Sequence, residues 1–234
     1  MRFRPHLLVV LMAITATGVR GQTPADADIY LVDFSWRQPV MVGKPVNITQ
    51  RKGYDNQPSF TPDGKSLLFT SIREDGQADS YRYNLRQRTT TQLTRTPESE
   101  YSPVVTPDRT HFSVIRVEKD QTQRLWKFPL SSGKGEPMLV LEKVKPVGYH
   151  CWLSADSLAL FVLGTPNTLQ LVRVSTGDTV RVEESIGRSL HRIPGKNAVS
   201  FVHKRTPTDW EINQLDLQTR RITLIARALE GSED

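Results

Sequence analysis

The stretch that decides the fold is Pro58-Ser59-Phe60-Thr61-Pro62-Asp63-Gly64-Lys65-Ser66-Leu67-Leu68-Phe69-Thr70-Ser71. Its centre suits a type I turn, because proline presets φ at the second position, aspartate tolerates the third and glycine takes the fourth. The run Leu67-Leu68-Phe69 is apolar on both faces, as in strands that neighbouring sheets cover on both sides. The stretch therefore predicts a β-hairpin within a protein of several stacked sheets.

The same pattern recurs three times with decreasing similarity, in residues 103–114, 151–161 and 192–201. Aligned on Thr61, Thr106, Ser154 and Ile193, the copies are 45, 48 and 39 residues apart. Two further predicted strands follow each hairpin, so four strands recur every ~40 to 45 residues, which is one blade of a β-propeller. A β-sandwich has similarly spaced turns but does not explain a four-strand period. We therefore predict an all-β propeller of four-stranded blades, with no helix after the leader.

The strongest repeat resembles a known family. The stretch from residue 58 to residue 71, the Asp79-Ser80-Tyr81 strand and the ending Gln92-Leu93-Thr94 are similar to the TolB-like propeller repeat. The similarity is strong for residues 49–95, fair for 96–140 and weak beyond. The resemblance implies a six-bladed propeller exported by a bacterium. It gives almost no information about activity.

The blade count predicts an unfinished propeller. Residues 28–49 supply only the outer two strands of a blade, and four blades follow at about 50–95, 96–143, 144–183 and 184–228. The last residues, 230–234, are similar to the lead-in at 97–101. We expect about four and a half blades here and roughly 65 further residues for six blades. A chain of this length that closes as an open propeller is the alternative.

Residues 1–21 are predicted to be a signal peptide. Arg2 and Arg4 precede a short apolar run, residues 7–14, that cannot span a bilayer. Cleavage is expected after Gly21 or Gly18, which leaves residues 22–234 as the propeller. The cleavage region holds no cysteine for a lipid anchor, and no later run is long enough to cross a membrane. The sequence thus predicts a periplasmic or secreted protein.

The overall charge does not indicate a nucleic-acid partner. The formal charge is +6, but removal of residues 1–21 leaves 28 basic against 25 acidic residues. Cys151 is the only cysteine, so an internal disulfide and a cysteine zinc site are excluded. It is expected to be a buried, inert thiol.

No motif of a known catalytic, nucleotide or metal site occurs, and the five histidines lack metal-ligand spacing. The aspartates that recur at the turns, Asp63, Asp108 and Asp156, are better explained by turn geometry than by acid–base chemistry. We predict no metal, no cofactor and no enzyme activity in this chain.

Candidate binding residues lie where the chain enters each innermost strand. They are polar or aromatic, as a recognition rim requires. The candidates are Tyr54, Asp55, Asn56, Gln57, Glu100, Tyr101, Tyr149, His150, Arg188 and Ser189. The same face is expected to carry the loops at 73–76, 118–120, 164–167 and 204–206. The Thr-Pro-Asp-Gly turns are expected on the opposite face, where small turn residues give a ligand few groups to bind. Water in the central channel would equally explain polar residues here.

Three functions remain open. The leading one is a non-catalytic, exported scaffold that binds a protein or peptide partner, or a small ligand, as the TolB resemblance implies. The alternative is the propeller of a prolyl-oligopeptidase-like serine peptidase whose hydrolase domain is not in this sequence. A carbohydrate-active propeller needs two facing carboxylates, for which Asp55 and Glu100 are the only candidates.

Overall fold

The computed structural model describes residues 26–35, 38–39, 41–131 and 135–229. The predicted signal peptide at 1–21 lies outside these residues, and so does the 230–234 segment on which the expected continuation of the chain rests. Both stay predictions. Among the described residues, no helix occurs that is long and apolar enough to cross a membrane.

Four antiparallel sheets of four strands follow one another along the chain. Their strands are β5 (Tyr54–Phe60), β6 (Ser66–Ile72), β7 (Ala78–Asn84) and β8 (Thr89–Gln92); β9 (Ser99–Val105), β10 (His111–Val117), β11 (Gln123–Pro129) and β12 (Met138–Leu139); β13 (Val147–Ser154), β14 (Ser157–Val162), β15 (Thr168–Arg173) and β16 (Thr179–Glu184); β17 (Ile186–Arg192), β18 (Ala198–Lys204), β19 (Trp210–Asp216) and β20 (Ile222–Arg227).

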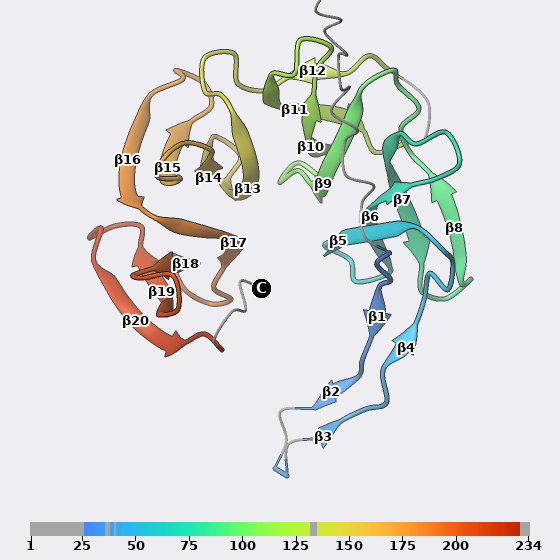
Figure 1. Ribbon diagram of the computed structural model, residues 1–234, viewed down its shortest axis with the longest axis horizontal. Coiled ribbons are helices and arrows are strands. Elements are labelled where there is room, and N and C mark those ends of the chain that lie inside the picture. The colour runs from blue at the N-terminus through green and yellow to red at the C-terminus, as the bar shows by residue number, and fades with distance from the viewer. Residues whose placement is uncertain (1–25, 36–37, 40, 132–134, 230–234) are drawn as a thin grey trace, which may run out of the picture.

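The four sheets are the blades of a propeller. In each, every strand pairs with the next one in the sequence. The first strands, β5, β9, β13 and β17, surround a common axis, and the last strands lie at the periphery (Figure 1). This arrangement confirms the predicted fold and the predicted order of the blades. A total of six blades stays a prediction.

The hydrophobic cores lie between neighbouring blades. In β6, Leu68 packs with Phe112 and Phe128 of the second blade, whereas Leu67 and Phe69 face the other way. Similar clusters join the second blade to the third and the third to the fourth. Strands of inner blades are therefore apolar on both faces because each face meets a separate sheet.

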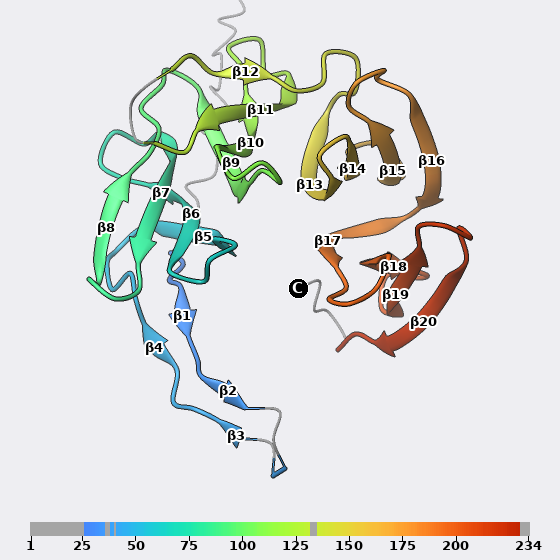
Figure 2. The same ribbon diagram turned by 180° about the vertical axis from the view of Figure 1, so that it is seen from behind.

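Residues 28–49, predicted as two outer strands, form a hairpin that extends away from the blades (Figure 2). Its strands are β1 (Tyr30–Leu31), β2 (Phe34–Ser35), β3 (Met41–Val42) and β4 (Val46–Asn47). β1 pairs with β4 and β2 with β3. At its base, Ile29 packs against Leu67 and Phe69 of the first blade.

The first two blades share one turn structure. The Gly64 amide donates to the Thr61 carbonyl at 2.8 Å, and Asp63 Oδ1 accepts from the Thr61 hydroxyl and the Lys65 amide. The pKa of Asp63 is lowered, and the hydrogen bond from Thr61 is the largest of the effects that lower it. Asp108 repeats these contacts in the second blade and its pKa is likewise lowered. These aspartates therefore stabilise turns, as predicted.

At the position of Gly64, the second blade carries Arg109. Gly64 has φ of +67° and Arg109 has φ of +58°. The left-handed conformation costs an L-residue about 1–2 kcal/mol, whereas glycine adopts it freely. Glycine loses more backbone entropy on folding, and this cost offsets part of the gain. We therefore expect Arg109→Gly to stabilise the protein by about 0.5–1 kcal/mol, as measured by urea denaturation. The control Arg109→Ala keeps the unfavourable φ and should show no such gain. Equal stability of the two variants would contradict this explanation.

Candidate functional site

One pocket, of about 510 Å³, collects the lead-in residues of all four blades. Gln57 of β5, Tyr101 of β9, Tyr149 of β13 and Arg188 of β17 all line it. Asn167 and Lys204, from the connections after β14 and at the end of β18, line it too. The lead-in residues of the four blades and two of the expected loops, at 164–167 and 204–206, therefore line one pocket, on the face that we call the lead-in rim.

The Gln57 side chain forms hydrogen bonds with residues of three blades. Its Nε2 donates to the Tyr149 hydroxyl at 3.3 Å, while its Oε1 accepts from Thr70 Oγ1 at 3.0 Å and from the Ser102 amide at 2.9 Å. Gln57 and Ser102 both have positive φ, of 56° and 53°, where β5 and β9 are bulged. Bulges redirect side chains locally, and here they direct the Gln57 amide toward the third blade.

Tyr54 lies near the pocket that Gln57, Tyr101, Tyr149 and Arg188 line. Burial, followed by the proximity of Tyr149 and Tyr101, raises the pKa of Tyr54, and a hydrogen bond with Asn56 and the charge of Arg188 oppose this rise. These influences place groups of four blades near one another. A phenol is protonated at neutral pH even at its ordinary pKa near 10, so Tyr54 is a hydrogen-bond donor there.

Three of the predicted rim residues are buried and do not line the pocket. Asp55 is 1% exposed, Glu100 0% and His150 6%. Each is the direct neighbour of a tyrosine, and successive side chains of a strand point to opposite faces. Their assignment to the rim is therefore corrected. Asp55 instead forms an ion pair with Arg51 at 2.9 Å, and Glu100 accepts from the Thr96 hydroxyl. This burial also removes the proposed carboxylate pair of a carbohydrate site.

The two remaining candidates lie close to the rim. Asn56 is exposed, and its Oδ1 accepts from the Gln57 amide at 2.6 Å. Ser189 is half-buried beside Arg188. Neither lines the pocket.

His150 lines a different pocket, of about 570 Å³, at the opposite end of the axis. This pocket also includes Arg109, Leu190 and Arg192, so the turn face is more hollowed than expected. His150 Nε2 lies 2.7 Å from Ser113 Oγ, which also accepts from Trp152 Nε1. Burial lowers the pKa of His150 to about 3, so the ring is neutral and serves the packing of two blades.

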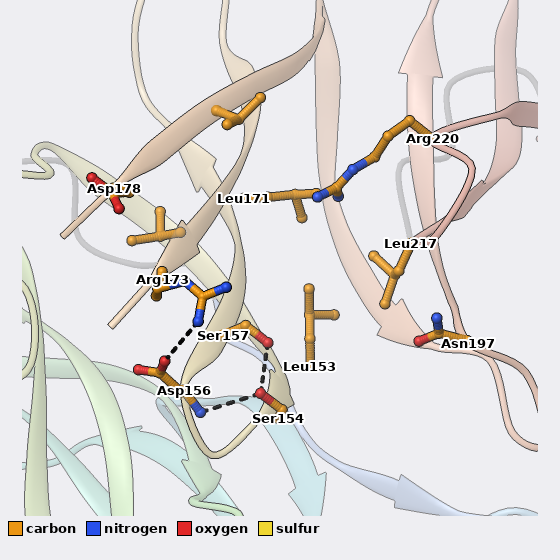
Figure 3. Close-up of a pocket in the computed structure, with 12 residues that line it drawn as sticks. Leu153, Ser154, Asp156, Ser157, Leu171, Arg173, Asp178, Asn197, Leu217 and Arg220 are labelled. Atoms are coloured by element: carbon orange, nitrogen blue, oxygen red, sulfur yellow. Dashed lines mark hydrogen bonds and ion pairs between the residues drawn. The ribbon is translucent and has the colours of Figure 1, made fainter. Parts of the chain in front are cut away.

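A further pocket on the turn face, of about 480 Å³, lies between the third and fourth blades (Figure 3). Asp156 there forms an ion pair with Arg173 at 3.4 Å and accepts from the Ser175 amide and hydroxyl. Its polar groups thus stabilise the turns. Because only two blades line this pocket, it is a weaker candidate than the lead-in rim.

Cys151, predicted to be a buried and inert thiol, is half-buried, and burial raises the pKa of its thiol to about 11, which keeps it protonated and unreactive. Among the described residues, no three metal-ligating side chains lie close enough to hold an ion.

Sequence reasoning missed the apolar wall of the pocket. This wall consists of Ile115, Val117, Phe161 and Leu163. All four lie at or just beyond the ends of second strands of blades, where the strand meets the lead-in face. The repeat period could have located them, since equivalent strand ends must face the same rim.

The comparisons with known proteins match this architecture. No protein-family model matches the chain. It is 28% identical over 124 residues to the dipeptidyl-peptidase 5 of Porphyromonas gingivalis, a match that covers 50% of this chain and 17% of the relative. Among solved structures, TolB of Acinetobacter baumannii aligns with a TM-score of 0.65 at 20% identity, over 86% of this chain and 52% of TolB. A puromycin-hydrolysing peptidase of Mycobacterium tuberculosis aligns with a TM-score of 0.60 at 14% identity, over 80% of this chain and 31% of the peptidase.

These likenesses support the TolB-like propeller fold. The fold is common to TolB and to the peptidase, so it does not by itself distinguish a binding protein from part of an enzyme. The chain spans about half of the Acinetobacter TolB and a smaller share of both peptidases.

Proposed function

We propose that this chain is an exported, non-catalytic propeller that binds a protein or peptide partner at the lead-in rim. The observation that carries the proposal is the convergence of Gln57, Tyr101, Tyr149 and Arg188, one from each blade, on a single pocket. Tyrosine and arginine are enriched among the anchors of protein interfaces. Export is inferred from the leader predicted at residues 1–21.

Photo-crosslinking in the native host tests this assignment of the face. A photoreactive amino acid is placed at Asn167, on the rim, or at Lys65, on the turn face. We expect partner crosslinks from position 167 only. In the Asn167 background, Tyr149→Ala together with Arg188→Ala should reduce the crosslinking at least tenfold, because interface anchors carry most of the binding free energy.

Lys65→Ala is the matched control, since it removes a charged side chain from the opposite face. It should leave crosslinking from position 167 unchanged. Crosslinks from position 65 that disappear in Arg109→Ala but survive the rim substitutions would mean that the partner binds the turn face and that the functional face is assigned wrongly.

A second function is favoured by one observation, the 28% identity to a dipeptidyl-peptidase. On this proposal, the propeller covers a serine hydrolase domain and the rim pocket selects what reaches it. A fluorophosphonate probe applied to the native host, followed by precipitation with an antibody to this propeller, separates the two functions. A labelled serine in the precipitated polypeptide indicates the peptidase, and an unlabelled polypeptide indicates the scaffold.

A further inference from the structure

The pocket of about 570 Å³ on the turn face, which we call the turn-face pocket, is lined by residues of all four blades. Each blade contributes residues of its innermost strand or of the turn that follows this strand. They include Phe60 of β5, Arg109 of the turn after β9, Trp152 of β13 and Arg192 of β17. No described residue lines both this pocket and the rim pocket. The volume is typical of pockets that bind small molecules.

The charged side chains that line the turn-face pocket are both arginines. Arg109 and Arg192 supply guanidinium groups, and no carboxylate of the described residues lines the pocket. Asp108, which precedes Arg109, accepts from the Thr106 hydroxyl and the Thr110 amide and is thereby bound within its own turn. The pocket therefore presents positive charge to a ligand.

The two guanidinium groups differ in their contacts with the protein. Arg109 is exposed, and within the described part of the chain its side chain forms no hydrogen bond or ion pair. Arg192 donates through Nη1 to the Leu153 carbonyl, a neutral acceptor that orients the guanidinium and leaves its charge uncompensated. A guanidinium has five N–H donors, so Nε and Nη2 of Arg192 retain donors as well. Such groups are suited to the oxygens of a carboxylate or a phosphate.

Much of the remaining pocket surface is apolar. The Phe60 side chain lines the pocket and is 59% exposed, whereas Leu153 and Leu190 are buried. Trp152 Nε1 donates to Ser113 Oγ at 2.9 Å, so the polar atom of this indole is satisfied within the protein and its ring adds apolar surface. A ligand that is complementary to both parts of the pocket carries an oxyanion on an apolar body.

We propose that the turn-face pocket binds a small organic anion, with Arg109 and Arg192 on its carboxylate or phosphate and with Phe60 and Trp152 against its apolar body. This inference goes beyond the proposed function and does not depend on it, because a protein partner at the lead-in rim leaves the turn-face pocket open.

Titration calorimetry of the purified chain with four probes tests both parts of the proposed ligand. Phenylacetate and phenyl phosphate carry an oxyanion and an aromatic ring, benzyl alcohol lacks the charge, and inorganic phosphate lacks the apolar body. We expect at least one of the two aromatic anions to bind at least tenfold more tightly than benzyl alcohol and inorganic phosphate. The tighter of the two shows whether the pocket takes a carboxylate or a phosphate ester.

Substitution of Arg109 tests the contribution of its charge. Arg109→Gln should weaken binding of the aromatic anion at least tenfold and leave benzyl alcohol unaffected, and Arg109→Lys should restore part of the loss. Arg88→Gln is the matched control. Arg88 is likewise an exposed arginine with a positive φ, of 54° against 58° for Arg109, and it does not line the pocket. This control should bind the anion like the unchanged protein.

Equal affinities for the aromatic anions and benzyl alcohol, or for the aromatic anions and inorganic phosphate, would overturn the proposal. Absence of binding by all four probes, or equal losses in Arg109→Gln and Arg88→Gln, would overturn it too. The rim variant with Tyr149→Ala and Arg188→Ala should bind the anion normally, and a loss confined to this variant would place the anion at the lead-in rim instead. Crosslinking from position 167 judges the proposed function separately.

Discussion

Replacement of Arg116 by methionine should destabilise the protein by about 3 kcal/mol, as expected when one partner of a buried ion pair is removed. Arg116 is 8% exposed and forms ion pairs with Glu98 and, at 3.5 Å, with Glu100. Its guanidinium also lies 4.9 Å from the ring centroid of Trp126. Methionine keeps the packing volume but leaves Glu98 and Glu100 without their cation. Urea denaturation at pH 8, above the raised pKa of Glu100, measures the loss.

A triple variant separates charge from packing in this result. Adding Glu98→Gln and Glu100→Gln to Arg116→Met removes both unpaired charges and should recover most of the lost stability. If the triple variant is no more stable than Arg116→Met alone, the loss comes from the stacking of Arg116 on Trp126 and Phe128, and the electrostatic explanation is wrong.

The second large effect concerns the pH dependence of stability. Glu100 is fully buried, and burial raises its pKa to about 7, with Asp79 contributing in the same direction and hydrogen bonds from Thr96 and Thr94 opposing it. A carboxyl with a raised pKa in the folded state lowers stability as the pH rises from about 4.5 to about 7, because only the unfolded chain ionises freely. Glu100→Gln removes this penalty. The variant should match the unchanged protein at pH 4 and exceed it by about 3 kcal/mol at pH 8.

The difference between the two proteins must be measured, because His150 acts in the opposite direction. Its pKa is lowered to about 3, so its contribution to stability rises with pH up to about 6.5 and offsets part of the Glu100 effect. This contribution is the same in both proteins and cancels. Glu74→Gln, at an exposed carboxyl, is the control for loss of one negative charge. A gain that does not change between pH 4 and pH 8 would contradict the assignment to Glu100.

The repeat period determined the fold without any tertiary information. Each blade is a local meander in which consecutive strands pair, so the spacing of Thr61, Thr106, Ser154 and Ile193 suffices to predict four sheets in their order. The double-faced apolar strands, such as Leu67-Leu68-Phe69, likewise required neighbours on both sides. The turn role of Asp63 and Asp108 followed from short-range backbone geometry.

The same period placed ten candidate residues near one rim but did not determine which of them face the pocket. Tyr54 and Asp55 are adjacent in sequence, yet Tyr54 lies with the other rim tyrosines and Asp55 is buried against Arg51. Bulges in the inner strands shift the alternation of side chains, and no residue pattern announces them.

Contacts between blades could not be predicted from the sequence either. Gln57 and Tyr149 are 92 residues apart, and their hydrogen bond forms only because three sheets pack around one axis. The sequence by itself determined the blades, because their strands pair with neighbours along the chain. Only the tertiary structure decided the site, because its residues come from four blades and are brought together by the packing of one blade on the next.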